Sequence, residues 1–107
     1  MVYALNTFDL VPGEEETYRQ YMLQTAPLLA DLDAKPVIAA RNPLRSLHGE
    51  TREFLLVMQF GSVADFETML ARQDEKEIGA LRERATTNYI WTLYEEWDVG
   101  AWLAPSE

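Results

Sequence analysis

The sequence contains no cysteine and a single histidine, and these two shortages exclude several chemistries. Without cysteine the chain has no disulfide bond, no thiolate nucleophile and no cysteine metal site. One histidine cannot supply a two-histidine or three-histidine metal centre, and no carboxylate shares a ligand spacing with it. No glycine-rich phosphate loop is present either. We therefore expect neither a metal nor a cofactor.

Basic residues are also scarce, with 9 lysines and arginines against 18 acidic residues and a net charge of −9. This charge disfavours nucleic acid and anionic lipid as partners. The negative charge either keeps the protein soluble or attracts a cationic ligand. No apolar run approaches the ~20 residues of a membrane span, and the first residues lack a basic, apolar leader. A cytoplasmic protein is expected.

The sequence predicts a single domain over residues 1–107. Since 48% of the residues are hydrophobic, the chain can form a hydrophobic core. Hydrophobic periodicity predicts the order strand, helix, strand, strand, helix, strand. The strands are expected over residues 2–10, 37–47, 52–60 and 88–99, and the helices begin near Glu14 and Ser62. Pro27 is expected to kink or break the first helix, and Gly79 to divide the second. Beyond residue 99, a short tail is expected, whose Trp102 and Leu103 should dock on a surface that the sequence does not specify.

Two of the expected strands lack the alternation that a half-exposed antiparallel sheet requires. Phe54–Met58 and Tyr89–Tyr94 are apolar at positions that point to both faces. Helices can cover one face, and the chain is too short to cover the other, so a second copy is the simplest cover. The predicted fold is α+β, ferredoxin-like β-α-β-β-α-β: a four-stranded antiparallel sheet with helices on one face, paired through the other face into a dimeric barrel. The proline-bearing second strand and the last strand would be its edges.

The stretch Met1–Gly13 resembles the first strand and turn of NIPSNAP domains, and Phe54–Phe66 resembles the third strand and second helix of NIPSNAP and EthD-like families. The chain thus looks like a member of the dimeric α/β-barrel superfamily. The resemblance implies a homodimer and a small-molecule pocket. It also implies an activity from a set that includes cofactor-free monooxygenases of polyphenolic substrates, haem-degrading enzymes, isomerases and cyclases.

Haem-degrading members of that superfamily place an asparagine in the first strand, a tryptophan in the second helix and a histidine further along. Asn6 matches the first. Met69 stands where the tryptophan should be, and residues 80–84 contain no histidine. Haem degradation is therefore not predicted.

Three residues are candidates for catalysis. His48, the single histidine, sits beside Gly49 in an expected hairpin, where it is either a general base or an exposed loop residue. Tyr94 is an alternative proton carrier. Asn6, with Gln59, could bind developing oxyanion charge, because a buried amide needs partners. Hydrogen bonding across the dimer is the other interpretation of these amides.

Further residues are candidates for binding substrate rings and charge. Tyr21 and Trp91 could wall an aromatic pocket, or belong to the core. Thr92 could line the same cavity, and Arg41 could hold a carboxylate or phenolate, or guard the sheet edge. The resulting hypothesis is a homodimer that binds a small organic molecule. It would be a cofactor-independent monooxygenase, cyclase or isomerase of an aromatic or polyketide-like substrate. A non-catalytic ligand-binding or protein-interaction dimer is the alternative.

Overall fold

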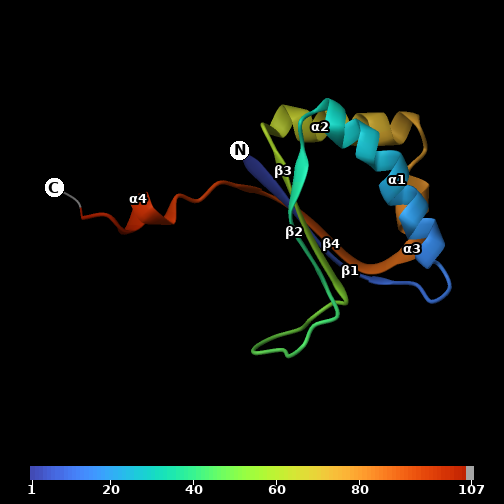
Figure 1. The fold of residues 1–107 in the computed structure, drawn as a ribbon, viewed down its shortest axis with the longest axis horizontal. Coiled ribbons are helices and arrows are strands. Elements are labelled where there is room, and N and C mark those ends of the chain that lie inside the picture. The colour runs from blue at the N-terminus through green and yellow to red at the C-terminus, as the bar shows by residue number, and fades with distance from the viewer. Residues whose placement is uncertain (106–107) are drawn as a thin grey trace.

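A computed structural model describes residues 1–105 of the chain. Four strands form one antiparallel sheet in the order β2-β3-β1-β4, and three helices cover one of its faces (Figure 1). The strands are β1 (Val2–Leu10), β2 (Lys35–Arg41), β3 (Phe54–Phe60) and β4 (Thr86–Glu95). The covering helices are α1 (Glu15–Asp31), α2 (Val63–Glu75) and α3 (Gly79–Ala85), and a short α4 (Val99–Leu103) follows. The ferredoxin-like order and the edge positions of β2 and β4 agree with the sequence prediction.

Helix ends follow the signals in the sequence. The Ser62 hydroxyl accepts a hydrogen bond of 3.1 Å from the Asp65 backbone N–H and so caps α2. Gly79 begins α3, as predicted. The expected break at Pro27 is absent, because α1 runs through it as one helix. Pro27 and Leu23 are both exposed, so water can satisfy the carbonyl that the proline leaves without a donor.

The core lies between the sheet and the helices. Burial alternates along β1, where Ala4, Asn6 and Phe8 face the helices. Met58 and Phe60 of β3 continue this apolar layer, which packs against α1 and α2 through Leu29, Leu32, Phe66, Met69 and Leu70.

The opposite surface of the sheet, here called the outer face, is covered by none of α1, α2 or α3 (Figure 1). The strand registers place its side chains in three rows: Lys35, Gln59, Tyr3 and Tyr94; Ile38, Val57, Leu5 and Thr92; Ala40, Leu55, Thr7 and Ile90. Lys35 is the one charged residue among them. The lack of alternation in the sequence thus corresponds to a real apolar surface that the single chain leaves open.

Two predicted boundaries around β2 and β3 are wrong. β2 ends at Arg41 rather than Leu47, because Asn42 adopts a left-handed φ of 55° and turns the chain out of the ladder. β3 begins at Phe54 rather than at residue 52. The intervening residues 42–53 project from the sheet (Figure 1). Gly49 in this projection has the positive φ expected of a turn glycine.

The last strand is also displaced from its predicted bounds of 88–99, since β4 covers Thr86–Glu95. Its only neighbour is β1, and the ladder ends where Glu95 meets Val2, the first residue of β1. The chain then forms an arm that leads away from the body and includes α4 (Figure 1). The expected docking of Trp102 and Leu103 is wrong for the single chain, in which they are 70% and 68% exposed.

Asp9, near the end of β1, forms hydrogen bonds to the residue before β3 and to a residue of β4. Its carboxylate accepts hydrogen bonds from the Asn88 side-chain amide at 2.9 Å and from the Glu53 backbone N–H at 2.8 Å. These bonds, with a smaller contribution from Arg52, hold the pKa of Asp9 below its ordinary value of 3.8.

The lowered pKa of Asp9 gives a prediction. Because the folded-state pKa lies below the unfolded one, the carboxylate stabilises the fold at neutral pH, and this contribution is lost as pH falls through the folded pKa. A carboxyl NMR titration should show Asp9 titrating below 3.8, and Asn88→Ala should raise its pKa. A midpoint unchanged by Asn88→Ala would show that the amide bond does not set it.

Candidate functional site

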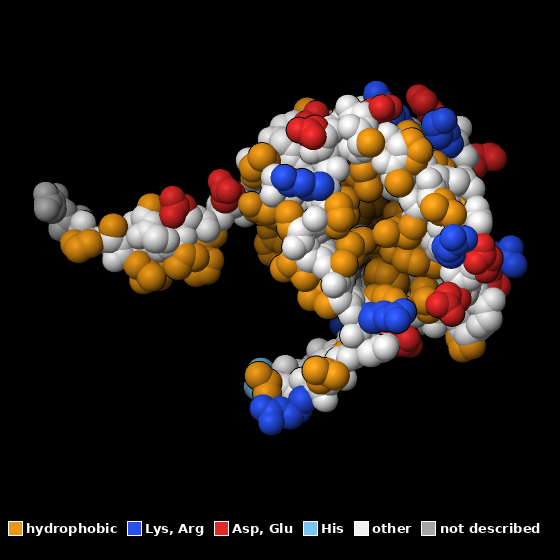
Figure 2. Space-filling view, viewed as in Figure 1, with side chains coloured by type: hydrophobic (Ala, Val, Ile, Leu, Met, Phe, Trp, Pro, Cys, Tyr) orange, Lys and Arg blue, Asp and Glu red, His pale blue; other side chains and the backbone are white. Residues whose placement is uncertain are grey.

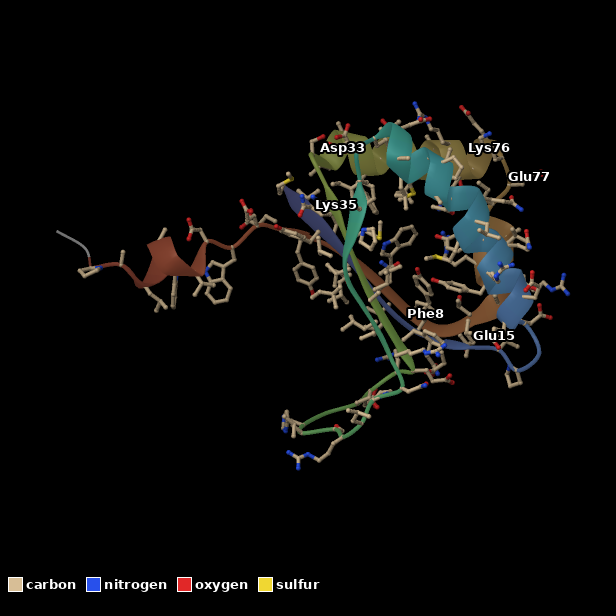
Figure 3. The ribbon with its side chains drawn as sticks, in the orientation of Figure 1. Phe8, Glu15, Asp33, Lys35, Lys76 and Glu77 are labelled. Carbon is tan, nitrogen blue, oxygen red and sulfur yellow. The ribbon has the colours of Figure 1, made fainter. Side chains whose placement is uncertain are left out.

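An apolar cleft of about 340 Å³ opens between α1 and the β2–β3 side of the sheet. The hollow is visible as a recess lined with hydrophobic side chains (Figure 2). Phe8 forms part of its floor and lies on the helix side of β1 (Figure 3). The other lining residues include Tyr18, Met22, Ala39, Arg41 and Leu56.

A smaller inner cavity of about 40 Å³ shares Tyr18, Met22 and Leu56 with the cleft as common walls. Unlike the cleft, it is lined by several polar side chains, which come from β1, α1, α2 and β4. These residues are Asn6, Tyr21, Thr25, Gln73, Tyr89 and Trp91. The cleft and inner cavity together offer an apolar space beside a small polar one.

Asn6 is fully engaged by the protein. Its side-chain amide donates to the carbonyls of Ala4 and Leu56, each at 3.2 Å, and its carbonyl oxygen accepts a short hydrogen bond from the Tyr89 hydroxyl. Both amide protons are therefore used. The predicted role of Asn6 as an oxyanion donor does not fit this geometry; it fixes the position of Tyr89 instead.

Gln73 joins the two helices across the cavity. Its amide nitrogen donates to the Tyr21 hydroxyl at 3.1 Å and to the Thr25 hydroxyl at 3.2 Å. Its oxygen accepts a hydrogen bond of 3.3 Å from Arg82 of α3. Only 2% of Gln73 is exposed, so these bonds meet the needs of an amide that would otherwise be costly to bury.

Arg82 packs its guanidinium against the aromatic wall of the cavity. The guanidinium carbon lies 4.7 Å from the centre of the Trp91 ring, 5.7 Å from that of Tyr21 and 5.8 Å from that of Tyr89. Such contacts between a cation and ring faces are favourable, more so when water is excluded. Arg82 also borders a surface depression beside α3, together with Asp74, Glu77 and Glu83.

Tyr18 and Tyr89 stay neutral at ordinary pH. Burial raises the pKa of both Tyr18 and Tyr89 well above the ordinary value of 10, and neighbouring tyrosines raise it further. Nearby Arg82 opposes the shift without reversing it. These phenols can donate or accept hydrogen bonds but cannot act as bases at neutral pH.

Three of the predicted site residues do lie together. Asn6, Tyr21 and Trp91 all line the inner cavity, on the helix side of the sheet. Arg41 lies at the mouth of the cleft, where it could meet the outer part of a ligand.

The remaining predicted site residues lie elsewhere. Gln59, Thr92 and Tyr94 belong to the outer face, so the sheet separates them from Asn6. A joint role of Asn6 and Gln59 at one oxyanion is therefore excluded by the alternation of side chains along strands. His48 is exposed in the projecting residues 42–53 and lines neither the cleft nor the inner cavity.

The sequence interpretation missed Gln73, Arg82 and Tyr89 as site residues. Arg82 carried a usable signal, because it lies four residues after Ile78 and three before Ala85, both fully buried. That spacing puts it on the inward side of α3. Tyr89 is two residues before Trp91 and so shares its face of β4.

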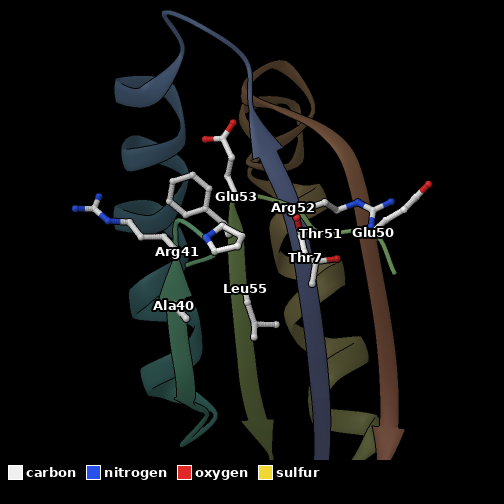
Figure 4. Close-up of a pocket in the computed structure, with 10 residues that line it drawn as sticks. Thr7, Ala40, Arg41, Glu50, Thr51, Arg52, Glu53 and Leu55 are labelled. Atoms are coloured by element: carbon white, nitrogen blue, oxygen red, sulfur yellow. The ribbon is translucent and has the colours of Figure 1, made fainter. Parts of the chain in front are cut away.

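A second, outer pocket of about 370 Å³ lies where the outer face meets residues 42–53 (Figure 4). Thr7, Ala40 and Leu55 form its floor, and Glu50 and Arg52 are among the residues around it. Arg41 borders both this pocket and the cleft. The outer pocket is continuous with the apolar rows of the outer face.

Replacement of Asn6 provides a test of its structural role. Asn6→Ala leaves the Tyr89 hydroxyl without its acceptor in a buried setting, which should cost about 1–3 kcal/mol of unfolding free energy. Gln20→Ala is the matched control, since that exposed amide bonds only to Glu16 and its loss should change stability by no more than about 0.5 kcal/mol. Equal effects in urea denaturation would contradict the assignment.

The sequence matches the family model described as a domain of unknown function, DUF1330, over residues 2–94. The chain therefore belongs to the DUF1330 family. No curated protein matches the sequence.

Solved structures share the fold. Methylated RPA0582, a protein whose other structure names Rhodopseudomonas palustris as its source, has a TM-score of 0.80 at 21% identity over 92% of this chain and 82% of its own. A candidate antibiotic biosynthesis monooxygenase from Deinococcus radiodurans has a TM-score of 0.60 at 19% identity, covering 92% and 94%. A dimeric ferredoxin-like protein of unknown function from Bacteroides fragilis has a TM-score of 0.56 at 15% identity, covering 89% and 95%. NIPSNAP-like domains also match, which confirms the resemblance.

Within residues 1–105, no group of three or more histidine, aspartate or glutamate side chains is arranged to hold a metal ion. None of the helices in that range combines the length and apolar character needed to cross a bilayer.

Proposed function

We propose that this protein is a homodimer that binds a small aromatic organic molecule in the cleft and acts on it without a cofactor. The observation that carries the proposal is the apolar cleft beside the polar inner cavity. Aromatic rings suit the cleft, because its walls are Phe8, Tyr18, Met22 and Leu56. A ligand site usually combines a large apolar space with a few polar groups that converge on it.

Similarity supports the enzymatic part of the proposal. The Deinococcus radiodurans protein with this fold is described as a candidate antibiotic biosynthesis monooxygenase. The proposed reaction class is that of a cofactor-independent isomerase, cyclase or monooxygenase on an aromatic or polyketide-like substrate. In such reactions, fixed hydrogen-bond donors can lower a barrier by several kcal/mol.

A non-catalytic ligand-binding dimer is the second candidate. None of the residues lining the inner cavity is a histidine or a carboxylate, so that cavity supplies no ordinary general base. Solvent-deuterium exchange into 2-tetralone, an aromatic ketone with acidic C–H groups, separates the two. A proton-transfer enzyme accelerates the exchange followed by NMR, whereas a binding protein leaves it at the buffer rate.

The homodimer is proposed from the outer face. The outer face has a broad apolar surface that no part of the body covers. Its apolar residues include Leu5, Leu55, Val57, Ile38 and Ile90. The partner proposed for it is a second copy, as in the dimeric Bacteroides fragilis protein of this fold. Each chain has a net charge of −9, so two copies repel each other. The three rows of the outer face contain only one charged residue, so pairing through this face brings few like charges into contact. Exposed Trp97 and Trp102 on the arm provide further apolar surface for the same partner.

Filling the cleft tests the ligand site. Thermal-shift measurements with 2-naphthoate, 2-naphthol and 1,8-dihydroxyanthrone should reveal at least one stabilising molecule in the wild type. Ala39→Phe places a ring in the cleft mouth and should abolish that stabilisation. Ala64→Phe, on an exposed part of α2, is the control and should retain it. Equal stabilisation of the two variants would place binding outside the cleft.

A further inference from the structure

The inner cavity offers its occupant hydrogen-bond donors. Trp91 lines the cavity, and its buried indole N–H has no partner within the described residues. A buried donor without an acceptor costs free energy, so a ligand oxygen placed there would be stabilised. This orphaned group is the first indication of what the cavity accepts.

The hydroxyl groups of Tyr21 and Thr25 add to these donors. Each hydroxyl oxygen already accepts a hydrogen bond from Gln73. A hydroxyl proton can rotate toward any acceptor, and the described residues show no acceptor for either proton. Both protons are therefore available to a ligand. Asn6 contributes no donor, since both of its amide protons are engaged.

The charge at the cavity is positive. Arg82 lies against its aromatic wall, and none of the residues that line the cavity is acidic. This contrasts with the chain as a whole, in which acidic residues outnumber basic ones two to one. A permanent cation beside a small cavity lined by several neutral donors favours an anionic oxygen.

We infer that the inner cavity binds the carboxylate of an aromatic acid whose ring lies in the cleft. This inference rests on the proposed ligand site and adds the chemical class of its occupant. A cavity of about 40 Å³ suits one small polar group, while the adjoining 340 Å³ of apolar space suits rings. Arg82 then acts as the specificity-determining residue, because it supplies the charge that a neutral analogue would not need.

Two probes of nearly the same shape test the inference. 2-Naphthoate carries the carboxylate, and 2-naphthamide replaces it by a neutral amide that brings its own N–H donors. By isothermal titration calorimetry, the wild type should bind the acid at least about tenfold more tightly than the amide. Arg82→Gln should remove most of this preference while leaving amide binding nearly unchanged.

Arg41→Gln is the matched control, because that arginine lies at the cleft mouth instead. It should retain the preference for the acid. A preference lost in Arg41→Gln and kept in Arg82→Gln would overturn the inference by placing the carboxylate at the mouth.

The remaining outcomes separate this inference from the proposed function. Equal binding of acid and amide by the wild type overturns the inference and leaves the aromatic cleft intact. Binding of neither probe, with no stabilisation by any of the molecules in the thermal-shift set, overturns both. Should Arg82→Gln fail to fold, Trp91→Phe serves in its place, since it removes one donor and should weaken the acid more than the amide.

Discussion

Val57→Glu is expected to convert the proposed homodimer into monomers. Val57 lies in the middle row of the outer face, between Ile38 and Leu5. In a dimer that pairs these faces, the substitution would bury two carboxylates without partners. That desolvation is costly, and the dissociation constant should rise by roughly a hundredfold or more.

Sedimentation equilibrium measures this effect directly. At micromolar concentration the wild type should sediment at twice the chain mass, and Val57→Glu at the chain mass. Val63→Glu is the matched control, because Val63 is exposed in the first turn of α2 and away from the outer face. A negative charge there is also favourable to the helix. If both variants remained dimeric, the interface would lie elsewhere.

Phe8→Ala is expected to have the largest effect on folding stability. Phe8 is 1% exposed, and its ring centre lies 4.9–5.3 Å from those of Tyr18, Phe54 and Tyr89. Removing the ring leaves a cavity among these three aromatic partners and should cost about 3–5 kcal/mol of unfolding free energy. Phe8→Leu retains most of the volume and should cost about 1.5 kcal/mol or less.

Chemical denaturation gives the loss of stability, and a phenol titration gives its local consequence. The pKa of Tyr18 and Tyr89 is raised mainly by burial. Water admitted by Phe8→Ala should therefore lower the pKa of both phenols toward 10. A stability loss below about 1 kcal/mol, with unchanged tyrosine titration, would show that the ring does not support the site.

Strand alternation and helix signals predicted most of the fold. The order of strands and helices followed from hydrophobic periodicity, and α2 begins close to the predicted Ser62. The ends of β2 and β4 could not be predicted so well. The end of β2 depends on the left-handed φ of Asn42, and the end of β4 depends on where its partner strand β1 stops. Hydrophobic periodicity reveals neither of these features.

The candidate site was predicted only in part, for a different reason. Asn6, Tyr21 and Trp91 were recognised because polar or aromatic residues stood out on apolar faces. His48 and Tyr94 were chosen for their chemistry alone, and chemistry does not specify which side of a sheet a residue occupies. Arg82 was missed because an arginine in a short, charged helix usually faces solvent. Its spacing from Ile78 and Ala85 was the available signal, and its contacts with three rings establish the inward position.

The most direct test of the account is the indole N–H resonance of Trp91 during titration with 2-naphthoate. The chain has three tryptophans, and Trp91→Phe assigns the resonance by its disappearance. The account predicts that the Trp91 signal moves downfield and saturates as its free N–H meets the carboxylate, while the exposed Trp97 and Trp102 signals stay in place. Saturable binding that leaves the Trp91 resonance unmoved would contradict it.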